Sequence, residues 1–164
     1  MTEAPSAFWN FSIGFYARPG VAAACLELQD EAGADINVVL YLFFLASQNR
    51  ALDRTAVAQL DAAAASWRER IVQPLRAVRR YLKNAAAPFD SAAAGRLREE
   101  IKRSELAAEH IQQITIERLF PPANFGRAAA SPAAAVRASL EAYAEVIGAL
   151  PPAATACLIE LFNA

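Results

Sequence analysis

Residues 36–50, INVVLYLFFLASQNR, decide the fold class of this chain. On a helical wheel the segment is apolar almost all the way round, which is typical of a helix buried on most of its sides. The β-branched residues Ile36, Val38 and Val39 favour a buried strand instead, but the length of the run and the helix formers that follow favour a helix. We therefore expect the apolar central helix of an all-α bundle.

Helical patterns continue on both sides of this segment. Ser6 can cap a helix over about 8–17, Pro19 and Gly33 suit the first turn and the C-terminal cap of a second, and Asp35 can cap the central one. Two longer helices are expected further on, each with one apolar seam. Their seam residues are Trp67, Ile71, Leu75, Val78 and Leu82 in one, and Leu97, Ile101, Ala108, Ile111, Thr115 and Leu119 in the other.

Proline residues mark the irregular positions of the chain. Pro74 lies inside the first long helix, so we expect a bend near Arg70 or a new helix that starts at Pro74. The segment 121–131 contains two prolines, a glycine and an asparagine, which predicts a loop. We expect one domain over 1–164 with about six to seven helices, a core over about 8–83, and a C-terminal helical pair over 132–163.

The charge balance offers no strong attraction for nucleic acid or an anionic membrane. There are 16 basic and 17 acidic residues, and the longest apolar run, 38–46, is far shorter than a membrane span. The N-terminus has no basic segment followed by an apolar one, and both cysteines lie in apolar helical surroundings. We expect a cytoplasmic protein with two reduced core thiols, no membrane association and no nucleic-acid partner.

The residues that would carry catalysis, metal binding or phosphate binding are missing from the sequence. A di-metal helical site would need Glu-x-x-His motifs, but the chain has one histidine, His110, and Ala107 stands three residues before it. The six glycines are scattered singly, so no phosphate-binding loop can be drawn, and no nucleophile motif is present. We predict no catalytic residues, no metal and no cofactor.

A basic stripe is the first candidate binding surface. It is predicted to project away from the Trp67 to Leu82 seam, where it could hold an anionic ligand or an acidic partner. The simpler interpretation is the solvated side of an amphipathic helix, and the lack of interleaved aromatic residues argues against nucleic acid. Its members are Arg68, Arg76, Arg79, Arg80 and Lys83.

A polar strip on the central helix is the second candidate. Asn37, Tyr41 and Gln48 line one side of an otherwise apolar surface, and buried polar groups need partners. An internal hydrogen-bond network, through Asn10 or Gln29, would satisfy them; a small polar ligand or a partner protein is the alternative. Asp30 lies in the last turn of the preceding helix, where the helix dipole disfavours a negative charge, so we expect it to have a partner, either Arg18 or an arginine of the central basic segment.

The N-terminal half also resembles a known family. The segments FWNFS (8–12) and YARPGVAAACLELQD (16–30), followed by Gly33, Asp35 and Asn37, resemble an uncharacterised proteobacterial family of small proteins, classified only as a domain of unknown function. The resemblance covers roughly 8–80 and implies no mechanism.

Two hypotheses for the function follow from the sequence. The first is a non-enzymatic helical interaction or regulatory domain, with a protein partner or a second copy as its ligand, because catalytic motifs are missing and aromatic residues are concentrated near the N-terminus. The alternative is a small-molecule-binding protein or an enzyme that uses the region of Gln29, Asp30, Asn37, Tyr41 and Gln48.

Overall fold

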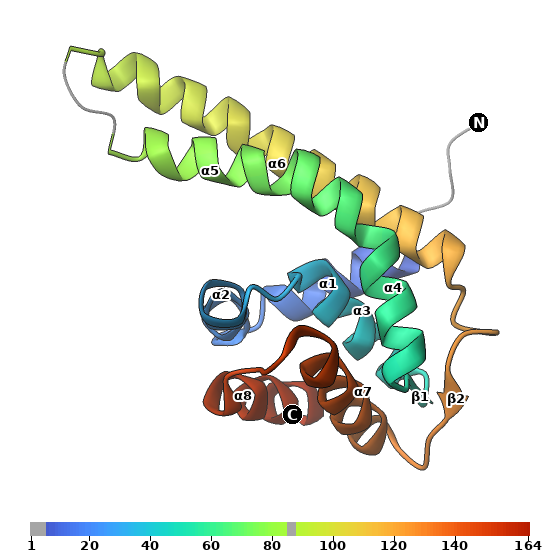
Figure 1. Cartoon of the computed structure of the whole chain (residues 1–164). Helices are drawn as coiled ribbons and strands as arrows, with labels where there is room; N and C mark the ends of the chain where they lie inside the picture. Colours follow the sequence, from blue (N-terminus) through green and yellow to red (C-terminus); the bar gives the residue numbers. More distant parts are fainter. Residues whose placement is uncertain (1–5, 85–87) are drawn as a thin grey trace. The chain divides into compact units, whose positions relative to one another are not determined.

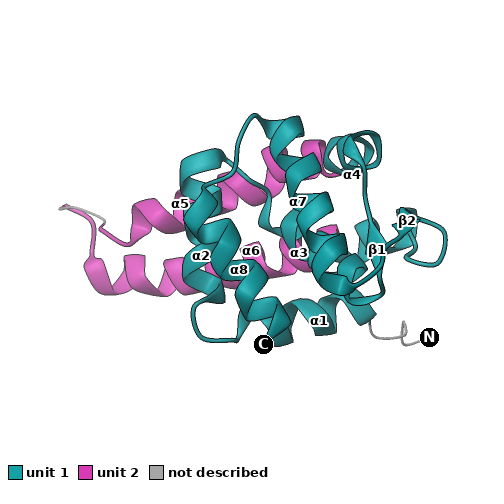
Figure 2. Cartoon of the chain, turned by 90° about the horizontal axis from the view of Figure 1, so that it is seen from below, with its two compact units in different colours: residues 1–63, 113–164 teal, residues 64–112 magenta. Residues whose placement is uncertain are grey.

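The computed structural model describes residues 6–84 and 88–164, and the chain divides into two compact units. Unit 1 comprises residues 1–63 and 113–164, and unit 2 comprises residues 64–112 (Figure 2). The chain is all-α, as expected, and its described residues include one pair of two-residue strands. No helix in 6–84 or 88–164 is long and apolar enough to cross a membrane.

Unit 1 contains most of the elements (Figure 1). They are α1 (Ala7–Tyr16), α2 (Val21–Ala32), α3 (Ile36–Ser47), β1 (Arg50–Ala51), the first part of α4 (Arg54–Trp67), the end of α6 (Ser91–Leu119), β2 (Arg127–Ala128), α7 (Pro132–Ile147) and α8 (Pro152–Asn163). The strands pair antiparallel, with Arg50 opposite Ala128. The expected loop 121–131 therefore contains one of the two strands.

Helix α3 is the central helix that its composition predicts. Every residue from Asn37 to Ala46 is buried. Aromatic side chains of α1 cover it: the rings of Phe8 and Tyr41 lie 4.7 Å apart, centroid to centroid, and those of Phe15 and Phe43 lie 5.0 Å apart. Helix α7 also packs against α3. The apolar surface of α3 is thus enclosed by α1 and α7.

The predicted caps at Ser6, Asp35 and Gly33 are confirmed, whereas Pro19 lies before Gly20, the N-cap of α2, and so outside the first turn in which it was expected. Ser6 caps α1 by accepting a 2.9 Å hydrogen bond from the Trp9 amide. Asp35 caps α3 by accepting from the amides of Asn37 and Val38 at 2.9 and 3.4 Å. Gly33 ends α2 at φ 65°, in the left-handed region that favours glycine.

Unit 2 contains the last turn of α4, the π-helical turn η1 (Arg68–Val72), α5 (Gln73–Leu82) and α6 up to Gln112. Helices α5 and α6 lie side by side in both views (Figures 1 and 2). The irregularity expected at Pro74 is the π turn η1, which ends two residues before this proline. Helix α5 follows the turn without a break. A bend of the axis stays a prediction.

The π turn also corrects the predicted seam of α5. A π turn bonds residues five apart rather than four, so it inserts one residue and rotates the following side chains. The inner positions run from Trp67 to the buried Val72 and on to the half-buried Arg76 and Arg79. Ile71, Val78 and Tyr81 are 36%, 45% and 72% exposed. The apolar seam extrapolated from Trp67 is therefore only partly buried.

The predicted seam of α6 is wrong in the same sense. Leu97, Ile111 and Leu119 are about half exposed. The predicted seam is correct at Ala108, and the other buried positions of α6 are Glu105, Gln112, Gln113 and Ile116. The apolar spacing alone misplaced this face, because the polar residues among these five find hydrogen-bonding or charged partners inside the fold, which lets them replace larger apolar residues there.

Candidate functional site

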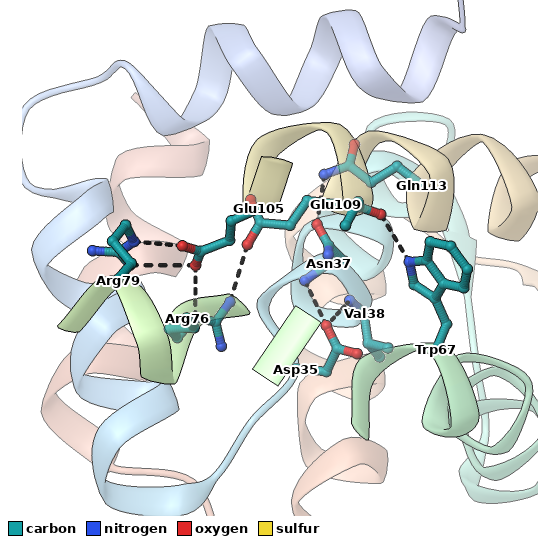
Figure 3. A network of polar contacts seen from close by, with 10 residues as sticks. Asp35, Asn37, Val38, Trp67, Arg76, Arg79, Glu105, Glu109 and Gln113 are labelled. Atoms are coloured by element: carbon teal, nitrogen blue, oxygen red, sulfur yellow. Dashed lines mark hydrogen bonds and ion pairs between the residues drawn. The ribbon is translucent and has the colours of Figure 1, made fainter. Parts of the chain in front are cut away.

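The polar strip on α3 begins with Asn37, which is 7% exposed. Its Oδ1 accepts a 2.8 Å hydrogen bond from Nε2 of Gln113 on α6, and its amide donates to Asp35 (Figure 3). Gln113 is itself 3% exposed. The partner of Asn37 is thus a buried amide of unit 1 that the sequence analysis did not identify, because Gln113 stood outside the predicted seam of α6.

Tyr41, the next member of the strip, also bonds internally. Tyr41 is fully buried, and its hydroxyl donates to the backbone carbonyl of Phe120. Burial raises the pKa of the Tyr41 hydroxyl, and the nearby charge of Glu117 raises it further. Glu117 accepts hydrogen bonds from the Ser6 hydroxyl at 2.5 Å and from the Phe8 amide at 3.3 Å. These contacts fasten the start of α1 to the end of α6.

The other candidates of the strip lie elsewhere. Gln48 is exposed at the C-terminal cap of α3, Gln29 is half-buried on α2, and Asp30 is exposed near the end of α2. Arg18, which was considered as a partner of Asp30, donates from Nη1 to the Leu161 carbonyl at 2.7 Å. The partner of Asp30 stays a prediction. Asn37 and Tyr41 lie in one buried layer, whereas Gln48 stands at the surface.

Two buried polar atoms of unit 1 have no hydrogen-bond partner among the described residues. They are the Gln113 Oε1 and the Ser12 hydroxyl oxygen. A buried carbonyl oxygen without a partner costs about 1–3 kcal/mol, so an ordered water is the simplest group to satisfy it. Gln113 Oε1 could accept a hydrogen bond from such a water or from a small ligand.

The basic stripe forms the second cluster, and the structure divides it. Arg76 donates from Nε to Glu105 and from Nη2 to Glu109, both at 3.0 Å (Figure 3). Arg79 donates from Nε to the other oxygen of Glu105 and from Nη2 to its first oxygen, the second bond at 3.2 Å. Arg76 and Arg79, two of the five stripe residues, are therefore directed toward α6 and not toward solvent.

Burial and charge both act on Glu105, whose side chain is 7% exposed. Burial alone would raise the pKa of this carboxyl group, but the hydrogen bonds and charges of Arg79 and Arg76 outweigh it and hold the pKa below its ordinary value. Glu105 is therefore an ionised structural residue. Arg80 and Lys83 are exposed and Arg68 is half-buried.

Metal-binding side chains do not cluster in the part of the chain that the structure describes. No group of three or more His, Cys, Asp or Glu residues there could hold an ion. Cys25 is buried and Cys157 half-buried, both as free thiols, and burial raises the pKa of Cys25 to about 12. A thiol that stays protonated at neutral pH is a poor nucleophile.

Among known proteins, one family model matches the chain, and the match covers most of its residues. No curated protein matches the chain, and no solved structure matches it either. A family model described as "Protein of unknown function (DUF2390)" matches residues 7–116, a range that runs from the start of α1 through the ion pairs of unit 2 to the buried end of α6. The chain belongs to this family of proteins of unknown function.

Proposed function

We propose that this chain is a non-enzymatic helical interaction domain, and that it binds a protein partner through one side of the α5–α6 pair. We call this surface the open side. The observation that supports it is a set of large apolar side chains, each 36–72% exposed, on two neighbouring helices. The open side consists of Ile71, Val78, Tyr81, Leu97 and Ile111.

Helix geometry places Ile71, Val78, Leu97 and Ile111 on the same side of the pair, and Tyr81, three residues after Val78, lies next to them at the outer edge of that side. Arg76 pairs with Glu109 and Arg79 with Glu105, so the two helices are antiparallel. Val78 precedes the inward Arg79 by one residue, and Leu97 precedes the half-buried Arg98 by one. One residue is a rotation of about 100°. The same rotation on two antiparallel helices turns both side chains to the same side.

Unit 2 also has very little core of its own. Among its described residues, the buried ones are small or polar except for one valine. They are Ala64, Val72, Glu105, Ala108 and Gln112. Fully burying one Val, Leu or Ile side chain stabilises a structure by about 1.5–3 kcal/mol. A partner that covered the open side would therefore add the apolar burial that the helix pair lacks, and exposed apolar patches commonly mark such contacts.

The test is a pair of matched variants. Val78→Glu combined with Tyr81→Glu places two charges on the open side, whereas Leu106→Glu places one at a residue 54% exposed that follows the inward Glu105 and so faces the other side. We expect the double variant to lose association, with itself or with a protein captured from native lysate, while Leu106→Glu retains it. Wild-type protein that is monomeric and captures nothing would refute the proposal.

A small-molecule site in the buried polar layer is the second candidate function. Only the unsatisfied Gln113 Oε1 supports it, because Asn37 and Tyr41 already bond to Gln113 and Phe120. Mass spectrometry of the natively purified protein tests it: a stoichiometric small molecule that is lost in Gln113→Leu would favour this candidate. We further propose a cytoplasmic location, which the two free thiols support.

A further inference from the structure

We propose that the partner on the open side is a second copy of this chain, so that two α5–α6 pairs form a two-fold symmetric four-helix bundle. This inference rests on the proposed function, since it uses the same surface. In a two-fold dimer each surface meets its own copy, and the two surfaces must be complementary to themselves. An apolar surface meets this condition without requiring opposite charges.

The distribution of charge in unit 2 distinguishes a second copy from an acidic partner. Unit 2 has ten Lys and Arg residues and six Asp and Glu residues, a net charge of 10 − 6 = +4. Arg80 follows the inward Arg79, and Lys102 follows the half-buried Ile101. One residue in this direction turns the side chain away from the open side.

Arg80 and Lys102 therefore lie on the opposite side from Val78 and Leu97. An acidic helix or an anionic lipid surface would need basic residues beside the apolar ones in order to gain from electrostatic attraction. Two copies that meet through their open sides keep Arg80 and Lys102 away from the contact. The position of Arg80 and Lys102, away from Val78 and Leu97, thus favours a second copy over these other partners.

The geometry of the pair also suits a four-helix bundle. Such bundles bury apolar side chains from facing helices along a shared interior, and unit 2 offers one stripe from each of two antiparallel helices. Val78 and Tyr81 are three residues apart on α5, and Leu97 and Ile111 are four helical turns apart on α6, so each stripe runs along its helix. A second pair would add its own apolar side chains to the interior of the bundle, where unit 2 of one copy by itself buries one large apolar side chain, Val72, among its described residues.

Analytical ultracentrifugation of the full chain tests the proposal. We expect wild type to sediment as a dimer at micromolar concentration, and Val78→Glu with Tyr81→Glu to raise the dimer dissociation constant by at least about 100-fold, because the new charges would be buried without partners. Leu106→Glu should remain dimeric. Circular dichroism should show that each variant is folded, because the substituted side chains are exposed.

Salt dependence gives a second readout. An apolar contact should persist or strengthen in high salt, whereas a complex held by the basic side should dissociate. A wild type that is monomeric at all concentrations would overturn the second-copy proposal. If that monomer nevertheless captured a lysate protein that the double variant failed to capture, the proposed function would stand and only this inference would fail.

A dimer that both the double variant and Leu106→Glu retained would overturn the inference and the assignment of the open side together. Co-capture of differently tagged chains distinguishes self-association from a change of shape. Wild-type chains should capture each other, and the double variant should not.

Discussion

Arg76 donates a 3.0 Å hydrogen bond from Nε to Oε1 of Glu105, and this ion pair lies at the interior of the α5–α6 pair rather than at its surface. Their side chains are 19% and 7% exposed, whereas Tyr81 and Leu97 on the same two helices are 72% and 46% exposed. The usual amphipathic arrangement is thus partly inverted. Charge joins the two helices, and apolar surface remains for another contact.

Glu105→Gln should lower the free energy of unfolding by about 1–3 kcal/mol. The amide keeps the shape of the side chain but loses the charge that accepts from Arg76 and Arg79, and hydrogen bonds to charged groups contribute more than neutral ones. Chemical denaturation measures the change. Glu99→Gln is the control: Glu99 pairs with Arg98 at 2.9 Å but is 53% exposed, so its loss should cost about 0–1 kcal/mol.

Acid should remove the contribution of Glu105. Its folded-state pKa is lower than its ordinary value, so the unfolded state binds a proton more readily than the folded state does. The stabilisation is complete above the ordinary carboxyl pKa and is lost as the pH falls through the lowered one. Unfolding free energies of wild type and Glu105→Gln should therefore differ at neutral pH and converge in acid. A difference that stays constant down to low pH would contradict the ion pairing of Glu105.

Asn37 and Gln113 should behave as an energetically coupled pair. Asn37→Ala leaves Nε2 of Gln113 buried without the Asn37 Oδ1 acceptor, which should cost about 1–3 kcal/mol. Gln113→Leu should remove much of that cost when combined with it. A double-mutant cycle should give a coupling energy of about 0.5–3 kcal/mol. Strictly additive effects would show that the 2.8 Å contact contributes nothing.

Two glycines should respond to alanine in opposite directions. Gly126 has φ 79°, and a Cβ there would lie 2.7 Å from the Ala51 carbonyl oxygen, so Gly126→Ala should destabilise the chain by about 1–3 kcal/mol. Gly14 lies inside α1 with nothing within 4 Å of an added Cβ, so Gly14→Ala should stabilise it by about 0.5–1 kcal/mol. Thermal melts compare them. Equal shifts would mean that the segment around Gly126 does not lie against β1 as described.

The sequence predicted unit 1 better than unit 2, for physical reasons. The caps at Ser6 and Asp35 and the enclosure of α3 depend on local hydrogen bonds and on composition, which are visible in one chain segment. The inner face of α5 depends on a single inserted residue at the π turn, which apolar spacing does not reveal.

The sequence also did not identify the hydrogen-bond partners of the buried polar residues. Asn37 was correctly expected to need a partner, but Asn10 or Gln29 was considered, and Gln113 is the residue that bonds to it. The sequence does contain one relevant pattern: Gln112 and Gln113 stand between Ile111 and Ile114, and an amide buried among apolar residues needs a hydrogen-bond partner.

Hydrogen–deuterium exchange of the full chain tests most directly whether the open side of α5 and α6 is a recognition surface. The comparison is between dilute protein and protein at a concentration where it associates, or with its captured partner bound. Covering the open side should slow amide exchange in peptides from 70–83 and 93–112, while peptides from α1, where Ile13 is equally exposed at 53%, should not change. Protection confined to α1 or α8, with α5 and α6 unchanged, would contradict the account.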